Sequence, residues 1–360
     1  MGSLAARARG SSLMRVLQVM AGAEKGGAEK FFDRLVPALA RHDLDQHVIC
    51  RPFPDRLSHL KACHIPFTTA SFHRLLDFQT RRIIRQTIHF YQPDIVLTWM
   101  SRASHLCPKE DFIFVSRLGG YYDLKYYKKA DYLVGNTPDI QNYFIKEGWP
   151  AERTAYLPNF VDAPRPEVLP QDRAVYCTPE KAPLLLSLGR FHDDKAFDVL
   201  ISALSHLPGV YLWLAGEGER EKRLRCLAQE HGVHGRIRFI KWQKDVDALY
   251  KAADVYVCPS RVEPLGNVVI EAWSHGLPVV AAESAGPKGL IQHQENGLLV
   301  PVDHAEALAH AIKEVLASKS LHRKLAARGL ATYLANYTEE RVCARYGDFL
   351  EKIYRKKKER

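Results

Sequence analysis

The sequence predicts an α/β protein with two doubly wound parallel-sheet domains, and three observations lead to this prediction. The chain has 360 residues, which is long for one average domain and comfortable for two. Short apolar runs alternate with amphipathic helical patterns in both halves, as in parallel sheets that helices cover on both faces. Between the halves, residues 163–183 carry five prolines and no hydrophobic periodicity, which indicates a linker.

The first half contains six short apolar segments that we expect to be buried strands. They are residues 15–20, 47–50, 65–67, 94–98, 112–115 and 132–134. The first of them runs into a glycine-rich turn and then into a helical pattern, which is how a Rossmann-type unit begins. The second half repeats the alternation. Its expected strands are residues 184–190, 210–215, 238–242, 255–258, 276–281 and 296–300, and helices over 303–354 complete the chain.

These patterns give the expected domain limits. Residues 14–162 form an N-terminal domain, 163–182 a linker that acts as a hinge, and 183–338 a C-terminal domain. Residues 339–360 form a last helix with a basic tail. Residues 1–13 lack the apolar region of a secretory signal, so we expect a disordered extension, with Met14 as an alternative start.

Composition narrows the function classes. The net charge of +10 indicates a nucleic-acid, anionic-membrane or phosphorylated partner. Zinc-finger, RNP and helix-turn-helix signatures are missing from the sequence, so nucleic acid is not expected. The seven cysteines are scattered, odd in number and without a Cys-x-x-Cys pair, which favours a reducing cytoplasm over disulfides or a zinc site. No apolar run approaches the ~18 residues of a membrane helix.

The stretch from Ser260 to Ala272 has the strongest chemical pattern. Pro264 disfavours helix at Glu263, whereas a helical pattern opens at residue 266, so Glu263 lies on a loop and Glu271 on the helix that follows. Free amides at that helix N-terminus suit a diphosphate. They belong to Leu265, Gly266, Asn267 and Val268. A carboxylate on each side of the phosphates can accept hydrogen bonds from the hydroxyls of a sugar and of a ribose.

The Glu263-to-Glu271 spacing, after a buried strand and with this proline and glycine, resembles the E-x7-E motif of retaining glycosyltransferases of family four. The resemblance covers nearly the whole chain. It implies the GT-B fold, in which two Rossmann-like domains face a cleft and the last helix crosses back onto the first domain. It also implies that Glu263 orients the donor sugar and Glu271 the ribose. The alternative is an ordinary strand–helix crossover whose Glu271 is a surface residue.

A second match to the family begins at Gly189-Arg190, continues to Lys195, and has Ala196 where the family usually has glycine. Arg190 and Lys195 would clamp the leaving diphosphate. The alternative is a structural ion pair with a neighbouring aspartate, Asp193 or Asp194. The Gly216-x-Gly218 turn after the next strand also matches, although many strand–helix turns have two glycines.

In the first half, Gly26-Gly27 resembles the family's G-G-x-E loop, which implies contact with the donor phosphates, and a tight turn alone is the alternative. Many members have a histidine at the acceptor hydroxyl after the strand that matches 112–115. This chain has Arg117 in that region and no histidine. We assign Arg117 to the catalytic set as a ligand of an anionic acceptor or of the donor phosphates.

Two basic segments bear on the acceptor. Residues 74–88 combine four arginines (Arg74, Arg81, Arg82 and Arg85) with leucine, phenylalanine and isoleucine, and residues 121–129 combine tyrosines with lysines. Both suit an anionic bilayer surface, where each cation adds about 1 kcal/mol. The alternative is a solvated helix face and an aromatic loop packed on the domain.

Trp242, at the end of the expected strand 238–242, could stack on a base or belong to the core.

The predicted function is a retaining, metal-independent glycosyl transfer without a cofactor. The donor is a nucleotide sugar, with UDP favoured and GDP-mannose next, and the acceptor is a lipid-linked or lipopolysaccharide-core saccharide. The expected location is the cytoplasm, with the inner membrane face as a peripheral site. Alternatives are an epimerase of the same fold and a non-catalytic assembly subunit. A dehydrogenase is disfavoured because G-x-G-x-x-G with a ribose-binding acid is missing from both halves.

Overall fold

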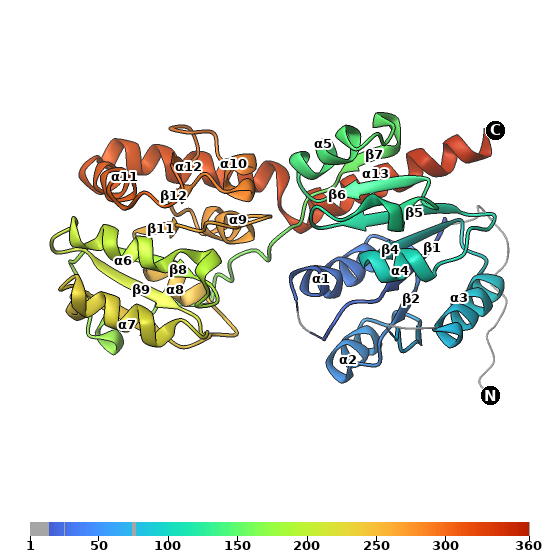
Figure 1. The fold of residues 1–360 in the computed structure, drawn as a ribbon, viewed down its shortest axis with the longest axis horizontal. Helices are drawn as coiled ribbons and strands as arrows, with labels where there is room; N and C mark the ends of the chain where they lie inside the picture. Colours follow the sequence, from blue (N-terminus) through green and yellow to red (C-terminus); the bar gives the residue numbers. More distant parts are fainter. Residues whose placement is uncertain (1–13, 25, 74–76, 360) are drawn as a thin grey trace. The chain divides into compact units, whose positions relative to one another are not determined.

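The computed structural model describes residues 14–24, 26–73 and 77–359, so the expected extension over residues 1–13 lies outside the described residues. The chain divides into two compact units (Figure 1). The first runs to Pro158 and resumes at Cys343, and the second covers Asn159–Val342.

The first unit contains a parallel sheet in the order β3-β2-β1-β4-β5-β6-β7. Its strands are β1 (Arg15–Met20), β2 (Asp45–Cys50), β3 (Phe67–Thr69), β4 (Ile95–Trp99), β5 (Ile113–Leu118), β6 (Tyr132–Gly135) and β7 (Thr154–Tyr156). Its helices are α1 (Gly27–Arg41), α2 (Pro54–Ala62), α3 (Phe78–Tyr91), α4 (Met100–Leu106), α5 (Pro138–Lys146) and the 3₁₀ turns η1 (Leu124–Tyr127) and η2 (Ala151–Arg153).

The second unit contains a parallel sheet in the order β10-β9-β8-β11-β12-β13. Its strands are β8 (Leu184–Leu188), β9 (Tyr211–Ala215), β10 (Ile237–Ile240), β11 (Val255–Cys258), β12 (Val279–Ala282) and β13 (Leu298–Val300). Its helices are α6 (Phe197–Ser205), α7 (Glu221–Glu230), α8 (Asp247–Ala252), α9 (Asn267–Ser274), α10 (Ala285–Leu290), α11 (Ala305–Ala317) and α12 (Lys319–Asn336), with η3 (Arg173–Tyr176), η4 (Asp193–Lys195) and η5 (His234–Arg236).

Both sheets therefore have the doubly wound arrangement that the apolar runs predict. The direction of winding reverses between β1 and β4 in one sheet and between β8 and β11 in the other. Ligands of such sheets bind outside the carboxyl ends of the strands at that reversal. In the second unit, the segments after β8 and β11 are the two that match the glycosyltransferase motifs, and the sheet makes them neighbours.

The last helix, α13 (Glu339–Lys358), begins in the second unit and belongs to the first unit from Cys343 onward. The predicted return of the chain to its first domain is thus observed. Near the end of the helix, Lys357 Nζ donates to Asp111 Oδ1 at 2.6 Å. Among the helices that the structure describes, none combines the length and apolar character needed to cross a membrane.

Side-chain contacts hold the predicted linker, residues 163–182, on the second unit, and its role as a hinge stays a prediction. The Arg165 amide donates to Asp247 Oδ2 at 3.0 Å, and Lys251 Nζ donates to the Arg165 and Val168 carbonyls, both at 2.6 Å. Arg173 Nη2 donates to the Ala252 carbonyl at 2.7 Å. Prolines remove periodicity but leave carbonyls available as acceptors, so the segment is fixed by side chains of α8 and its flanks. The boundary between the units falls earlier, after Pro158.

Candidate functional site

Lys195 and Glu263 meet at the carboxyl edge of the second sheet. Lys195 ends η4 after β8, and Glu263 lies on the loop after β11. Lys195 Nζ donates to Glu263 Oε2 at 2.5 Å, and the Gly266 amide donates to Glu263 Oε1 at 3.2 Å. Only 23% of the Lys195 side chain and 10% of the Glu263 side chain are exposed. The structure therefore brings together the two residues that the separate motifs predict.

The backbone around Glu263 is constrained. Gly266 has φ of +72°, a left-handed conformation, and a Cβ there would lie 2.7 Å from Leu290 Cδ1. The Gly286 amide donates to the Glu263 carbonyl at 2.6 Å. Because α10 packs this closely on the loop and φ is left-handed, position 266 favours glycine. The backbone that carries the Glu263 side chain is therefore held in one position.

The acidic neighbours of Lys195 have other partners. Asp193 pairs with Arg220 at 2.5 Å, and Asp194 lies 3.3 Å from His192 Nδ1. The alternative in which Lys195 pairs with one of these aspartates is therefore wrong. Arg190 is exposed, and its side chain has no hydrogen bond or ion pair to the residues that the structure describes, so it is available to a ligand.

Ala196 explains why the family usually has glycine at this position. It is the residue before α6 and has φ of +50°, a left-handed conformation that costs a non-glycine residue roughly 1–2 kcal/mol. Ala196 is fully buried. The chain thus keeps the turn that aims Lys195 despite the substitution.

The Gly216-x-Gly218 turn packs on the turn after β8. A Cβ on Gly216 would lie 1.9 Å from the Gly189 carbonyl oxygen, and one on Gly218 would lie 2.4 Å from the Phe191 carbonyl oxygen. Both contacts are with backbone, which cannot move aside as a side chain can. Gly216 therefore allows the two turns to lie together, and it sets the position of the Gly189-Arg190 segment.

Helix α9 begins where the sequence predicts, with Gly266 as its N-cap residue. The Val269 and Ile270 amides already donate to the Gly266 carbonyl, at 2.9 and 3.3 Å. Within the described part of the chain, the Leu265, Asn267 and Val268 amides donate to no acceptor. These amides therefore have free donors at a helix N-terminus beside Glu263, which suits an anion.

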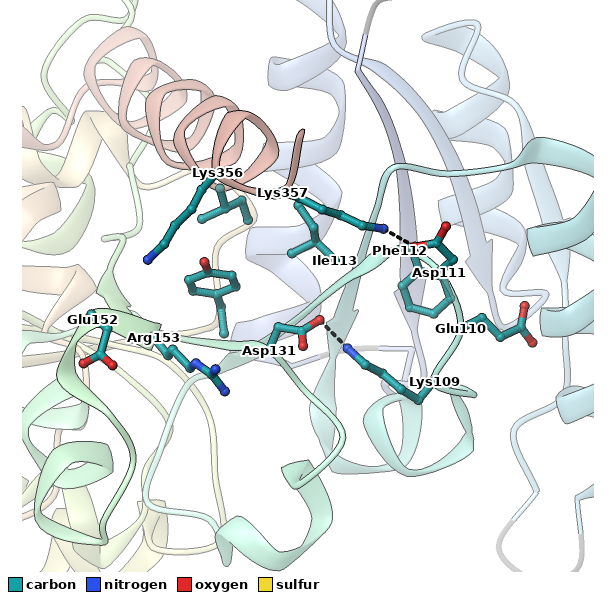
Figure 2. A pocket seen from close by; sticks show the side chains of 12 residues that line it. Lys109, Glu110, Asp111, Phe112, Ile113, Asp131, Glu152, Arg153, Lys356 and Lys357 are labelled. Carbon is teal, nitrogen blue, oxygen red and sulfur yellow. Dashed lines mark hydrogen bonds and ion pairs between the residues drawn. The ribbon is translucent and has the colours of Figure 1, made fainter. Parts of the chain in front are cut away.

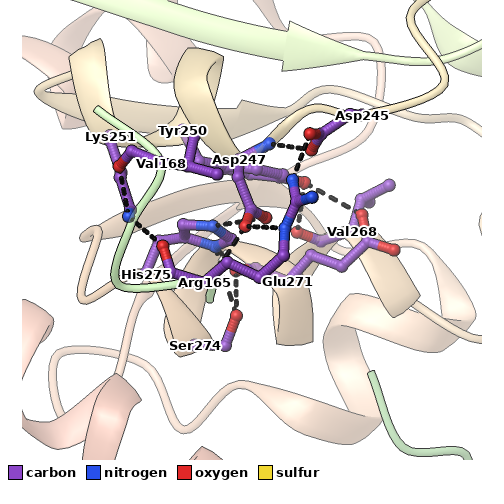
Figure 3. Close-up of polar contacts among 10 residues, drawn as sticks. All are labelled: Arg165, Val168, Asp245, Asp247, Tyr250, Lys251, Val268, Glu271, Ser274 and His275. Carbon is purple, nitrogen blue, oxygen red and sulfur yellow. Dashed lines mark hydrogen bonds and ion pairs between the residues drawn. The ribbon is translucent and has the colours of Figure 1, made fainter. Parts of the chain in front are cut away.

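A polar network that includes Tyr250, His275 and Asp247 holds the Glu271 side chain (Figure 3). Tyr250 Oη donates to Glu271 Oε2 at 3.1 Å. The Tyr250 ring stacks on His275, with centroids 4.6 Å apart. His275 Nε2 lies 3.2 Å from Asp247 Oδ1. Burial, and then the Glu271 charge, raise the pKa of Tyr250 well above its usual range, so the phenol remains a donor.

Asp247 connects this network to the segment that precedes β8. Its other oxygen accepts from the Arg165 amide at 3.0 Å and from Arg165 Nε at 3.2 Å. Burial raises the pKa of Asp247, but the hydrogen bonds from Arg165 and His275 outweigh burial and lower it overall. Asp247 is thus an ionised anchor, and the orientation of Glu271 depends on residues that the E-x7-E spacing does not include.

In the first unit, the glycine-rich turn encloses a carboxylate. Glu29 is buried, and its Oε1 accepts from the Ala23 amide at 2.8 Å. A Cβ on Gly26 would lie 2.3 Å from Glu29 Oε2, whereas one on Gly27 would meet nothing within 4 Å. The lack of a side chain at Gly26 therefore leaves space for the Glu29 carboxylate, which accepts the hydrogen bond from the Ala23 amide. Gly27, the first residue of α1, leaves its surroundings open.

Arg117, predicted to bind an anionic acceptor or the donor phosphates, is buried in the first unit, and its catalytic assignment stays a prediction. The residue is 3% exposed. Its guanidinium carbon lies 4.7 Å from the Phe31 ring centroid and 4.6 Å from that of Trp99, and its Nε donates to Tyr346 Oη of α13 at 2.9 Å. Arg117 therefore makes cation–π contacts with two aromatic rings, which help to hold it in the core of the first unit.

Trp242, for which a core position was one alternative, is 61% exposed after β10. A base-stacking position stays a prediction.

Figure 2 shows a pocket in the first unit, where Lys357 pairs with Asp111 and Lys109 with Asp131. This pocket lies at the amino ends of β5 and β6, the opposite edge from the one that doubly wound sheets use for ligands.

Two doubly wound parallel sheets, with paired glutamates after the strand at one reversal point, define a GT-B glycosyltransferase. Comparison with known proteins agrees. Residues 170–331 match "Glycosyl transferases group 1", and residues 25–165 match "Glycosyltransferase Family 4". The chain belongs to the family-four glycosyltransferases.

Full-length relatives support this membership. The chain is 39% identical to "Lipopolysaccharide core biosynthesis glycosyltransferase LpsE" of Rhizobium meliloti over 89% of this chain and 94% of the relative. It is 33% identical to LpsD of the same organism over 94% of this chain and 98% of the relative.

Solved structures show the same fold at lower identity. A glycosyltransferase from Rickettsia africae is 20% identical, with a TM-score of 0.84 over 94% of this chain and 98% of that one. Anabaena HepE in complex with UDP and glucose is 22% identical, with a TM-score of 0.78 over 94% of this chain and 100% of that one.

Proposed function

We propose that this glycosyltransferase moves a sugar from a nucleotide sugar, with a UDP-sugar favoured over GDP-mannose, to a saccharide or lipid-linked acceptor of the lipopolysaccharide core. The observation that carries the proposal is the Lys195–Glu263 pair beside the free amides of α9. The acceptor class is supported by the names of the Rhizobium relatives. The UDP preference is supported by the UDP in the Anabaena structure of the same fold.

The chemistry follows from where charge develops. The acceptor oxygen forms a bond to C1 of the donor sugar while the bond from C1 to the phosphate oxygen breaks, and the electron pair leaves with the nucleoside diphosphate. The acceptor hydroxyl proton passes to that leaving oxygen when attack occurs on the same face, which retains the configuration. Arg190, Lys195 and the α9 amides would stabilise the growing negative charge without a metal. Glu263 would hold the sugar hydroxyls, and Glu271 the ribose.

An anionic membrane surface is proposed as a partner of the first unit. Along α3, Arg81, Arg82 and Arg85 are exposed. Phe78 and Phe90, at the two ends of the helix, are 70% and 78% exposed. Cations beside exposed aromatic rings are typical of a helix that lies in a membrane interface.

The test is a thermal-shift panel of UDP-, GDP-, ADP- and CMP-sugars, with NAD as the control. A ligand at 100 times its Kd adds about 2.7 kcal/mol to stability. A shift with one nucleotide sugar identifies the donor base. NMR of the transferred product then reports retention, and activity that survives EDTA reports metal independence. Inversion, or loss of activity in EDTA, would contradict the respective part of the proposal.

A further inference from the structure

We propose that a basic pocket in the first unit binds a phosphate group. The pocket is lined by Arg81, Arg102, His73, His105 and Asp77 together with apolar side chains. Arg102 lies in α4, directly after β4, and so at the carboxyl edge where doubly wound sheets bind their ligands. The site rests on the proposed function, because it would hold the acceptor side of the reaction.

Scattered elements bring the cations together. Arg51 follows β2, and its Nη2 donates to the Phe72 carbonyl at 2.6 Å. Arg102 Nη1 donates to the same carbonyl at 3.0 Å. On the facing side, Arg81 Nη2 of α3 lies 3.4 Å from His105 Nε2. Lys129 Nζ donates to the His105 carbonyl at 2.9 Å. Two guanidiniums that share one carbonyl oxygen lie close to one another, and both are held by a neutral group.

Among the described residues, positive charge exceeds negative charge in this cluster. No carboxylate of the described chain forms an ion pair with Arg51, Arg81, Arg102 or Lys129. The carboxylate in the pocket wall is Asp77, and its oxygens accept from the Thr80 amide at 3.0 Å and from the His73 amide at 2.7 Å. Asp77 therefore serves as the N-cap of α3 and forms no ion pair with these arginines, although its charge acts on Arg51.

The titration of the cluster agrees with an excess of positive charge. Burial, and then the charge of Arg102, lower the pKa of Arg51, and the charge of Asp77 opposes this shift without reversing it. Burial, and then Lys129 and Arg81, lower the pKa of His105. Cations that repel one another without a counterion are stabilised by an anion. Arginine forks match the oxygens of a phosphate, and hydrogen bonds between charged groups are the strong ones.

The experiment titrates inorganic phosphate into the full chain by calorimetry, at constant ionic strength and with UDP filling the second unit's site. Arg81→Gln and Arg102→Gln are each expected to weaken phosphate binding by roughly tenfold or more, the size of a lost charged hydrogen bond. Arg82→Gln is the matched control, because Arg82 is the exposed neighbour on α3 outside the pocket lining. Its change should stay within about twofold.

Equal losses in Arg81→Gln and Arg82→Gln would mean a diffuse basic surface and would overturn the pocket. Arg81→Gln removes no backbone contact, so it remains informative if Arg102→Gln disturbs the fold. The Lys195→Ala variant should bind phosphate as wild type does, and a loss there would place the phosphate at the donor site instead. UDP binding is measured first in the same cell, so a failure of the donor assignment is seen separately.

Two further arms separate the sources of the phosphate. If it belongs to a saccharide, glucose 6-phosphate displaces inorganic phosphate in an Arg81-dependent way, and glucose does not. If it belongs to a lipid headgroup, Arg81→Gln weakens binding to phosphatidylglycerol vesicles more than Arg82→Gln does, with phosphatidylcholine vesicles as the baseline. Either result supports a phosphate pocket. Insensitivity to Arg81→Gln in both arms contradicts it.

Discussion

The carboxyl edges of the two sheets share a strand order but hold some of their cations differently. In the second unit, Lys195 pairs with Glu263, and Arg261 pairs with Asp198 at 2.7 Å and with Asp303 at 2.5 Å. In the first unit, Arg51 and Arg102 share a carbonyl and have no carboxylate partner in the described chain. The ion pairs of Arg261 hold loops in place, whereas Arg51 and Arg102 leave their charge for a ligand.

The difference fits a separation of roles, in which the second unit would bind the donor and the first unit a charged acceptor. The donor site would need fixed geometry around a leaving diphosphate, which ion pairs and close glycine contacts supply. A site for a charged acceptor gains more from unbalanced charge, which attracts the ligand before contact. The following predictions test this comparison, from the largest expected effect to the smallest.

Lys195→Ala should lower kcat/KM by about 10²–10³-fold, the cost of losing one donor to a developing charge. The fold should survive, because Lys195 lies on an edge turn rather than in the core. Steady-state kinetics and circular dichroism check the two parts. Lys288→Ala is the control, since that lysine is exposed and lies 3.8 Å from Glu283. Near-normal turnover in Lys195→Ala would remove this residue from the catalytic set.

Gly266→Ala should destabilise the second unit by about 1–2 kcal/mol through its left-handed φ. It should also weaken UDP binding, because the added Cβ would lie 2.7 Å from Leu290 Cδ1 and 3.4 Å from the Gly286 backbone, so that the Leu290 side chain or the Glu263 loop must shift. Gly276→Ala is a matched control, with φ of +66° and nothing within 4 Å of an added Cβ. Chemical denaturation measures the loss of stability from the strained φ, and UDP titration measures the loss of affinity at the site. Equal loss of UDP affinity in both variants would contradict the loop argument.

Tyr250→Phe should weaken UDP binding by about 0.5–1.5 kcal/mol, the value of one hydrogen bond, because Glu271 loses the hydrogen bond from Tyr250 Oη. The stacked ring remains, so stability changes less. Calorimetry with UDP and with 2′-deoxy-UDP gives the test. If Tyr250 positions Glu271 for the ribose, the ratio of the affinities for UDP and for 2′-deoxy-UDP is smaller in the variant than in the wild type. An unchanged preference would limit Tyr250 to a packing role.

Asp77→Ala should cost about 1 kcal/mol at neutral pH, as the loss of a helix N-cap does. Burial raises the pKa of Asp77, but hydrogen bonds from Thr80 and His73 outweigh burial and lower it. Because the folded pKa is depressed, the carboxylate stabilises the fold above its unfolded value of about 3.9 and loses this effect as pH falls through the folded value. Denaturation curves of both proteins should therefore converge in acid. A constant difference would show that charge is not involved.

Much of the proposed donor site was predictable because its residues belong to short local patterns. Pro264 and Gly266 fix the start of α9, and this places Glu263 on a loop and Glu271 on a helix. The apolar runs likewise locate most strands. The short edge strand β7 was missed, since Thr154–Tyr156 is half-buried and too brief to show periodicity.

The remaining features depend on distant parts of the chain. Arg117 follows a strand, but the rings that enclose it come from α1, β4 and α13. Arg51 and Arg102 meet because β2 and β4 flank β1, and no spacing rule connects their positions. Tyr250 supports Glu271 from a helix that precedes the motif. Sequence patterns show which residues are neighbours along one element, whereas these contacts are made by topology.

The return of α13 to the first unit has a consequence for biosynthesis. Tyr346, which binds Arg117, is translated only after the whole second unit. While the chain is still on the ribosome, the first unit therefore waits with a charged group between aromatic rings and an uncovered apolar surface, the condition in which nascent domains need chaperones. A message that stops before Cys343 would yield a complete second unit beside a permanently unfinished first one.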